Sequence, residues 1–198
     1  MTLSFTLFDT AIGRCAIAWS GRCVVCLQLP EDNNAKTRAR VLQRYSAARE
    51  AVPPRQIARA LDTVAALLRG TPSDLSSIPL DMEGLPPFHR RVYEAARAIP
   101  FGAAVTYGEL ARRSGVPGAA RAVGQALARN PFAIIVPCHR VLAAGGKTGG
   151  FSASGGAATK LRLLAIEGYK MGLAKSLEKS QRENRAPSLF DSRASADL

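Results

Sequence analysis

The stretch IIVPCHRV, residues 134–141, carries three apolar β-forming residues into a proline, after which a thiol, an imidazole and a guanidinium follow in turn. Proline has no N–H for a sheet and holds the residue before it extended, so the pattern predicts a buried strand that stops at Pro137. Cys138 is then expected just beyond the strand. A thiol attacks as its thiolate, which a base such as His139 and a cation such as Arg140 both favour. Cys138 is therefore the candidate nucleophile.

Cys138 and His139 are neighbours in the chain, and neighbouring side chains of an extended strand point to opposite faces. Contact between the thiol and the imidazole therefore requires an irregular backbone or a bridging water. The glycine-rich stretch 145–156 follows and is predicted to form a loop that lines a pocket around Cys138. The remaining cysteines lie in predicted strands and are expected to be core thiols. They are Cys15, Cys23 and Cys26.

The 198-residue chain is long enough for one domain with a substantial core or for two small ones. Its net charge of +12 favours a polyanionic partner, nucleic acid first, and the alternative is a positive surface that merely aids solubility. No signal peptide or membrane span is predicted, and the four cysteines are expected to be reduced thiols of a cytoplasmic protein. No metal site is predicted, because Cys23-x-x-Cys26 has no second pair to complete it.

The first part of the chain is predicted to form a sheet with helices. Three strands are expected, at 3–8, 14–19 and 22–29. Ser20-Gly21 is predicted to be a hairpin turn. The stretch 32–46 is compatible with a helix, and a helix is predicted at 55–69. Its inward face is expected to consist of Ile57, Leu61, Val64 and Leu68. The stretch 71–86, rich in Pro, Ser and Asp, is predicted to connect two subdomains.

The second part of the chain is predicted to be mostly helical. Long helices are expected at 87–99, 119–129 and 157–167. Thr106-x-x-Glu109 has capping-box spacing and predicts a short helix through 110–113. A tight glycine-containing turn joins this helix to the next, which makes a helix-turn-helix candidate, with an ordinary helical hairpin as the alternative. The apolar residues of the last helix include Leu161, Leu164 and Ala165.

The helix at 119–129 consists mostly of glycine and alanine, with Arg121 near its start. Small side chains such as those of Ala119 and Ala122 let a backbone approach a broad surface closely, but they cannot read base edges in the major groove. If this helix meets DNA, we expect it to bind with little sequence preference. Apart from its arginines, Gln125 is the one residue of this helix with a polar side chain.

These features together resemble the O6-alkylguanine-DNA alkyltransferases, or methylated-DNA–protein-cysteine methyltransferases. The resemblance rests on PCHRV at 137–141, preceded by AARAVG at 119–124 and by Asn130-Pro131, and followed by the glycine loop and LLAIEG at 163–168. It covers residues 87–168, and the N-terminal strands are similar to the variable N-terminal domain of that family.

The resemblance implies an α+β fold in three parts. A small N-terminal α/β domain of antiparallel strands plus helix is expected at 1–85, with the linker included. A mostly helical, winged helix-turn-helix-like domain at 86–168 is expected to carry the active-site cysteine. A polar tail at 169–198 is expected to be disordered.

The resemblance also implies roles for individual residues. Cys138 matches the acceptor that takes the alkyl group from guanine O6 and keeps it as a thioether, in a single turnover. His139 matches the residue that draws the thiol proton through a water, with Glu167 as its carboxylate partner. Tyr107 matches the residue that assists nucleotide flipping and protonates the leaving guanine. Arg121 matches the finger that fills the vacated place in the base stack.

The pocket and hinge positions follow from the same resemblance. Asn130 matches the hinge that ties the helix-turn-helix to the active-site segment. Backbone groups of Cys138, Val141 and Ser152 match those that hold the guanine edge. Phe151 stands where many relatives carry a tyrosine, so stacking on the base is expected without a hydroxyl contact.

Three other classes share parts of the pattern. A non-enzymatic lesion-binding protein of the same fold would carry tryptophan in place of Cys138. A winged-helix transcription factor would need base-reading side chains on the second helix of the pair, where few are present. A methyl-responsive regulator would need an N-terminal sensor domain with a four-cysteine metal site, which the sequence does not contain.

The implied partner is double-stranded DNA containing O6-alkylguanine, and no cofactor, metal or membrane is implied. The protein is expected to be a cytoplasmic monomer. Pro187-Ser188-Leu189-Phe190 resembles the end of short peptides that dock on DNA sliding clamps, although Ala186 stands where a glutamine would be expected. The alternative is that this segment is an incidental part of the tail.

Overall fold

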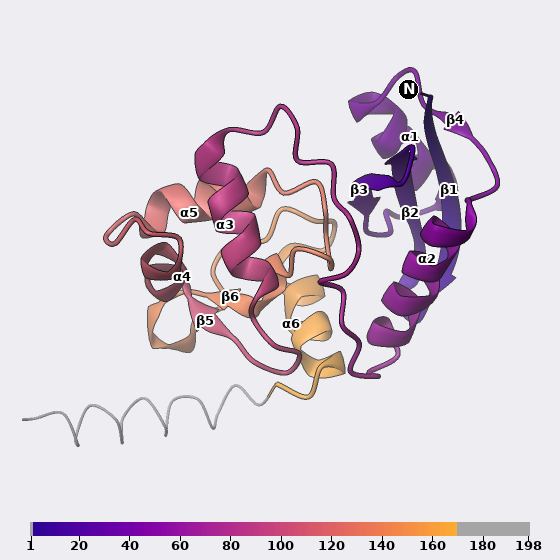
Figure 1. The fold of residues 1–198 in the computed structure, drawn as a ribbon. Helices are drawn as coiled ribbons and strands as arrows, with labels where there is room; N and C mark the ends of the chain where they lie inside the picture. Colours follow the sequence, from indigo (N-terminus) through magenta and orange to yellow (C-terminus); the bar gives the residue numbers. More distant parts are fainter. Residues whose placement is uncertain (1, 170–198) are drawn as a thin grey trace, which may run out of the picture.

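The computed structural model describes residues 2–169, which form two lobes (Figure 1). The sheet with its helices makes the N-terminal lobe, the later helices make the C-terminal lobe, and the segment between α2 and α3 runs between them. The tail from 170 onward, including the clamp-like segment at 187–190, lies outside the described residues. No helix among residues 2–169 is both long and apolar enough to cross a membrane.

A four-stranded sheet forms the N-terminal lobe. Its strands are β1 (Leu3–Thr10), β2 (Gly13–Ser20), β3 (Cys23–Gln28) and β4 (Arg49–Glu50). They lie in the order β3-β2-β1-β4, with β1, β2 and β3 antiparallel and β4 parallel to β1. The predicted hairpin turn is wrong by one residue, because Ser20 still pairs with Cys23 and the turn is formed by Gly21 and Arg22.

Helices cover both faces of this sheet, because strand side chains alternate in direction. α1 (Asn34–Arg44) packs against one face, where its Val41 joins a core cluster with Phe5 and Cys26. α2 (Arg55–Leu68) belongs to the core on the other face, toward which Trp19 points. Leu61 is only partly buried, whereas the other predicted inward residues of α2 are buried.

The C-terminal lobe contains the predicted helices. They are α3 (Pro87–Arg97), α4 (Tyr107–Arg113), α5 (Ala120–Ala128) and α6 (Gly156–Ile166). Thr106 caps α4 as predicted, since its hydroxyl accepts the Glu109 N–H at 3.1 Å. α4 and α5 pack together across a tight turn in which Gly115 and Gly118 have φ of +74° and +85°, values that favour glycine.

The predicted buried strand before Pro137 is wrong. Ile134 has a φ of +69°, and the Ile135 N–H donates to Ala133 O at 2.8 Å. Pro137 has φ −79° and ψ 68°, and the N–H of the next residue donates to Val136 O at 2.8 Å. Hydrogen bonds between residues two apart are those of γ-turns, so the segment bends twice instead of extending.

The strand in this region follows the cysteine instead of preceding it. β6 (Val141–Leu142) pairs in parallel with β5 (Val105–Thr106), and a 3₁₀ turn at Cys138–Arg140 comes before it. The apolar residues at 134–136 are indeed buried. Their β-branched composition reflected burial in the core and not an extended backbone, a known weakness of strand propensities.

The buried face of α6 does not coincide with its apolar residues. Leu161 and Ala165 are exposed, whereas Leu164 faces the core. The buried positions on this face are Lys160, Leu163, Leu164 and Glu167. They recur at the spacing of one helix face, which includes two charged residues.

One hydrophobic core joins the two lobes, with members from β2, β3, α2, α3, α4 and α5. The outer edge of β3 adds backbone contacts. Leu27 N–H donates to Pro131 O at 2.8 Å, and Val24 N–H donates to Pro79 O at 2.9 Å. The segment that leads to the cysteine is therefore bonded to the N-terminal sheet. The division of the chain into domains at residue 86 stays a prediction.

Replacing Tyr93 by phenylalanine should lower the free energy of unfolding by about 1 kcal/mol. Tyr93 is fully buried in α3, and its hydroxyl donates to Ala126 O of α5 at 2.9 Å. Urea denaturation of both proteins measures the difference. Tyr45→Phe is the matched control, because Tyr45 makes a bond of 2.9 Å to Val25 O at a half-buried position, where we expect a smaller loss. A Tyr93→Phe protein as stable as the original would contradict the prediction.

Candidate active site around Cys138

The side chain of Asn130 holds the turn that carries Cys138. Asn130 Nδ2 donates to Val136 O at 2.9 Å, and its Oδ1 accepts the Phe132 N–H at 2.9 Å. The same Val136 carbonyl accepts the Cys138 N–H. These bonds satisfy backbone groups that a sheet would otherwise pair. Asn130 thereby links the end of α5 to the active-site segment, which is the geometry expected of the predicted hinge.

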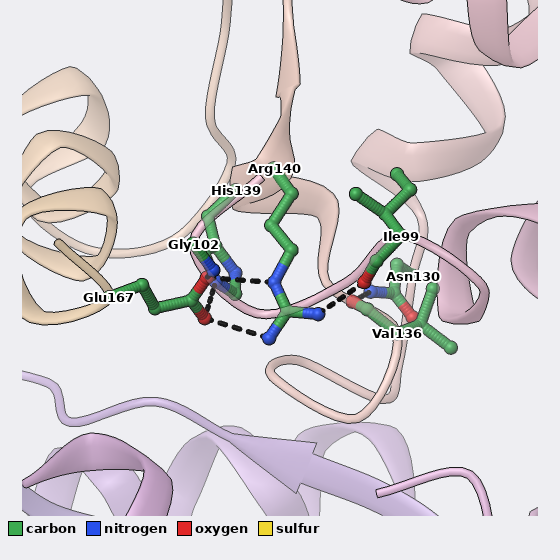
Figure 2. Close-up of polar contacts among 7 residues, drawn as sticks. All are labelled: Ile99, Gly102, Asn130, Val136, His139, Arg140 and Glu167. Atoms are coloured by element: carbon green, nitrogen blue, oxygen red, sulfur yellow. Dashed lines mark hydrogen bonds and ion pairs between the residues drawn. The ribbon is translucent and has the colours of Figure 1, made fainter. Parts of the chain in front are cut away.

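The carboxylate of Glu167 is buried and contacts several other parts of the chain (Figure 2). His139 Nε2 lies 2.8 Å from its Oε1, and the Arg140 guanidinium donates to both oxygens at 2.8 and 2.9 Å. Gly102 N–H donates to Oε2 at 3.2 Å, and Arg140 also donates to Ile99 O at 2.5 Å. Burial alone would raise the pKa of Glu167, but the hydrogen bonds from His139 and Arg140 outweigh it and lower the pKa from 4.5 to about 2.

His139 is fully buried and is set up to act as a base. Burial lowers the pKa of His139 below its ordinary value of 6.5, although Glu167 opposes this shift, so the imidazole is neutral near pH 7. The contact with Glu167 places the N–H on Nε2 and leaves the lone pair on Nδ1. Nδ1 has no hydrogen-bond partner among residues 2–169. The basic nitrogen is therefore available to a neighbouring group.

The thiol of Cys138 is protonated at rest. Burial raises the pKa of this thiol above 9.0, and the Asn130 side chain, the Lys160 charge and nearby backbone N–H groups oppose the shift only in part. Attack by the sulfur therefore needs a base to take its proton. The prediction that Arg140 stabilises the thiolate is wrong, because its guanidinium is bound to Glu167 instead.

Lys160 is the cation near the thiol, and the sequence analysis missed it. Its side chain is fully buried, with Nζ donating to Val141 O at 2.5 Å and lying 5.6 Å from the centre of the Tyr107 ring. Burial lowers the pKa of Lys160 to about 8. The sequence feature that could have identified Lys160 is its position two helical turns before Glu167, on the same helix face. A search for apolar periodicity ignores such charged residues.

Cys138 opens into a cleft of about 840 Å³ between α4, α5 and the glycine-rich loop. The predicted site residues that line it are Tyr107, Arg121, Gln125, Cys138, Phe151 and Ser152. Tyr107 is the first residue of α4, and its hydroxyl donates to Gly150 O at 3.3 Å. The loop comes this close because Gly149 has a φ of +68° and no Cβ, which would lie 3.0 Å from the tyrosine ring.

Besides Asn130, His139 and Glu167, three predicted positions do not line this cleft. Ala119 is the N-cap residue of α5, and both it and Ala122 are partly buried. Val141 is fully buried, and its carbonyl already accepts the Lys160 ammonium group. The contact of the Val141 backbone with a guanine edge stays a prediction.

Residues 2–169 contain no group of three or more His, Cys, Asp or Glu side chains that could hold a metal ion. All four cysteines are free thiols. Cys15 and Cys26 are buried on opposite faces of the sheet, as core thiols were predicted to be, whereas Cys23 is partly exposed.

Comparison with known proteins agrees with this geometry. The family described as 6-O-methylguanine DNA methyltransferase, DNA binding domain, matches residues 87–169. A methylated-DNA–protein-cysteine methyltransferase of Mycobacterium leprae is 39% identical over 163 residues, which cover 82% of this chain and 91% of that protein. A DNA base-flipping protein of Thermus thermophilus is 44% identical over 110 residues, or 56% of this chain and 72% of that protein.

One similar solved structure matches this protein over both lobes. The crystal structure of Mycobacterium tuberculosis OGT in complex with DNA is 35% identical, with a TM-score of 0.68, and the match covers 83% of this chain and 92% of that one. The similarity therefore includes the N-terminal lobe as well as the part around Cys138. By identity and coverage together, the chain belongs to the family of methylated-DNA–protein-cysteine methyltransferases.

Proposed function

We propose that the protein repairs O6-alkylguanine, mainly O6-methylguanine, in double-stranded DNA by taking the alkyl group onto Cys138 in one irreversible turnover. The supporting observation is that Cys138 lines a cleft beside a helix-turn-helix and is followed by a histidine paired with a buried glutamate. A base must leave the duplex before its O6 can be attacked, so a DNA-binding helix and an adjoining pocket are both needed. The similar OGT was solved bound to DNA, which supports DNA as the partner.

The thiol proton passes to His139 through a water. His139 Nδ1 carries the free lone pair that accepts this proton. Nε2 contacts the Glu167 carboxylate, whose negative charge stabilises the resulting imidazolium. The sulfur then attacks the carbon bound to O6, and the carbon–oxygen bond breaks with its electron pair left on the guanine. Lys160 stabilises the thiolate during attack, which agrees with its opposing effect on the pKa of Cys138.

Tyr107 and Arg121 handle the flipped nucleotide. Burial raises the pKa of Tyr107, so its hydroxyl is protonated before the reaction, and it donates this proton to the leaving guanine. Arg121 is exposed near the start of α5 and reaches into the place that the base vacates. The small residues Ala119 and Ala122 let α5 approach the minor groove, with Gln125 beside them.

The extruded guanine occupies the cleft next to the glycine-rich loop. The Phe151 ring lines this cleft and offers a surface for stacking, and Ser152 lies beside it. Backbone groups of Val141 and Ser152 hold the guanine edge, and Asn130 keeps the cysteine in register with the helix-turn-helix. The product is a thioether, whose sulfur is a poor leaving group, so each molecule reacts once.

The wider setting of the reaction is part of the proposal. Four free cysteines favour a reducing compartment, and we place the protein in the cytoplasm as a monomer. A contact of segment 187–190 with a sliding clamp rests on its sequence alone. Clamp retention that is equal for the full chain and for a chain ending at residue 187 would dismiss that contact.

Incubation with a duplex that carries one O6-methylguanine should place one methyl group on the Cys138 peptide. Peptide mass spectrometry and quantified repaired DNA should agree at one methyl per protein, without turnover. The matched control is Cys23→Ser, which removes the other partly exposed thiol and should not change the yield. Folded protein with an unmodified Cys138 beside unrepaired DNA would refute the proposed function.

The rate of methyl transfer should stay level as the pH falls through 6.5. Burial lowers the pKa of His139 below that value, so the imidazole remains a neutral base where an exposed histidine would already be protonated. On the acidic side, the rate should fall only below pH 6.5, as His139 takes up a proton. Single-turnover rate constants between about pH 5 and pH 9 measure the profile. A decline centred at or above pH 6.5 would contradict this assignment of the base.

Glu167→Gln should slow methyl transfer by about 100-fold, because the neutral amide cannot stabilise the imidazolium of His139. It should also make stability less sensitive to acid. The pKa of Glu167 is depressed from 4.5 to about 2, so its contribution is complete above pH 4.5 and is lost as the pH falls toward 2. Single-turnover rates and acid unfolding curves measure both effects. Glu94→Gln, an exposed change in α3, is the control and should leave both unaltered.

A further inference from the structure

A second cleft, of about 350 Å³, also reaches Cys138. Its walls come from both lobes: the end of β3 and the C-terminal part of α1 on one side, and the segment 130–133 with the glycine-rich loop on the other. It shares Cys138, Phe151 and Ser152 with the larger cleft next to α5. The thiol therefore lies where two spaces meet, and the mechanism described above uses only one of them.

In-line displacement determines what the second space can hold. The sulfur, the carbon under attack and O6 lie on one line, so the other substituents of that carbon must project sideways from it. A methyl group has only hydrogens there and needs no further room. A larger substituent needs a space that adjoins the sulfur and is separate from the base pocket. The second cleft adjoins Cys138 and extends away toward α1.

The far wall of this cleft is polar and mainly cationic. Arg40 and Arg44 of α1 line it together with Glu31. Arg40 contacts the neutral Gln43 at 3.2 Å, and neither arginine forms an ion pair with a carboxylate among residues 2–169. The nearby Arg38, by contrast, is bound to Glu50 and does not line the cleft. Arg44 is also hydrogen-bonded to the Cys26 side chain, but neither guanidinium is neutralised by a carboxylate of residues 2–169, and each keeps N–H donors for an anionic ligand at this end.

We propose that the second cleft binds the distal part of larger O6 substituents and that Arg40 and Arg44 make the protein selective for O6-carboxyalkylguanine over neutral adducts of equal size. This deepens the proposed function and rests on it. Sγ of Cys138 bonds to the methylene carbon, the carbon–O6 bond breaks, and the product is S-carboxyalkylcysteine. The thiol proton leaves through His139, and the guanine takes up a proton in exchange.

The test compares two adducts of the same shape in the same duplex. One oligonucleotide carries O6-(3-carboxypropyl)guanine, whose carboxylate lies at the far end of a short chain, and the other carries its neutral amide, O6-(3-carbamoylpropyl)guanine. Single-turnover rate constants for the full chain give a ratio in which contributions from DNA binding cancel, because the duplex is the same. The original protein should favour the carboxylate, and the double variant Arg40→Gln/Arg44→Gln should lower the ratio by about fivefold, as expected for partly exposed ion pairs.

Two further variants sharpen the result. Glu31→Gln removes the acidic group from the cleft wall and should raise the ratio. Arg38→Gln removes a charge from the same helix outside the cleft and should leave the ratio unchanged. A ratio that the double variant does not alter, or that Arg38→Gln alters equally, would overturn the inference. Failure of the original protein to repair O6-methylguanine would instead refute the proposed function, so the two failures are distinguishable.

Discussion

The buried carboxylate of Glu167 is the contact on which the active site depends. It stands at the end of α6 and binds the Cys138–Arg140 turn and the loop at Gly102; through Arg140 it also reaches the end of α3. Arg140 balances its charge, so His139 can stay neutral beside it. One anion therefore fixes both the backbone around the nucleophile and the tautomer of its base.

The regular parts of the fold were predictable because their apolar residues recur with the period of a strand or a helix. The segment 134–136 was not, since Asn130 holds it through side-chain-to-backbone bonds that leave no trace in an apolar pattern. The site was predictable where a motif named its residues, as for Cys138 and His139. It was not predictable for Lys160, because a buried charge is rare and apolar patterns exclude it. Arg140 was assigned to the thiolate because it is near in sequence, but the 3₁₀ turn directs it to Glu167.

Cys138 lies at the seam of two lobes that share one core. The C-terminal lobe supplies the proposed nucleophile, the proposed base and the helix-turn-helix. The N-terminal lobe supplies one wall of the second cleft and a strand that is bonded to the active-site segment at Pro131. The part of the chain with the less diagnostic sequence thus helps to shape the space around the thiol.

The outer edge of β3 has a consequence for how the protein can be divided. In the intact chain, Leu80 and Phe132 bridge to this strand, and its N–H groups donate to Pro79 and Pro131. A fragment that ended after α2 would expose an unpaired strand with Val24 and Leu27 on it. Such an edge is a template for intermolecular pairing and aggregation. The connecting segment and the C-terminal lobe together therefore cover the edge of the N-terminal sheet, and the two halves should be expressed together to remain dispersed.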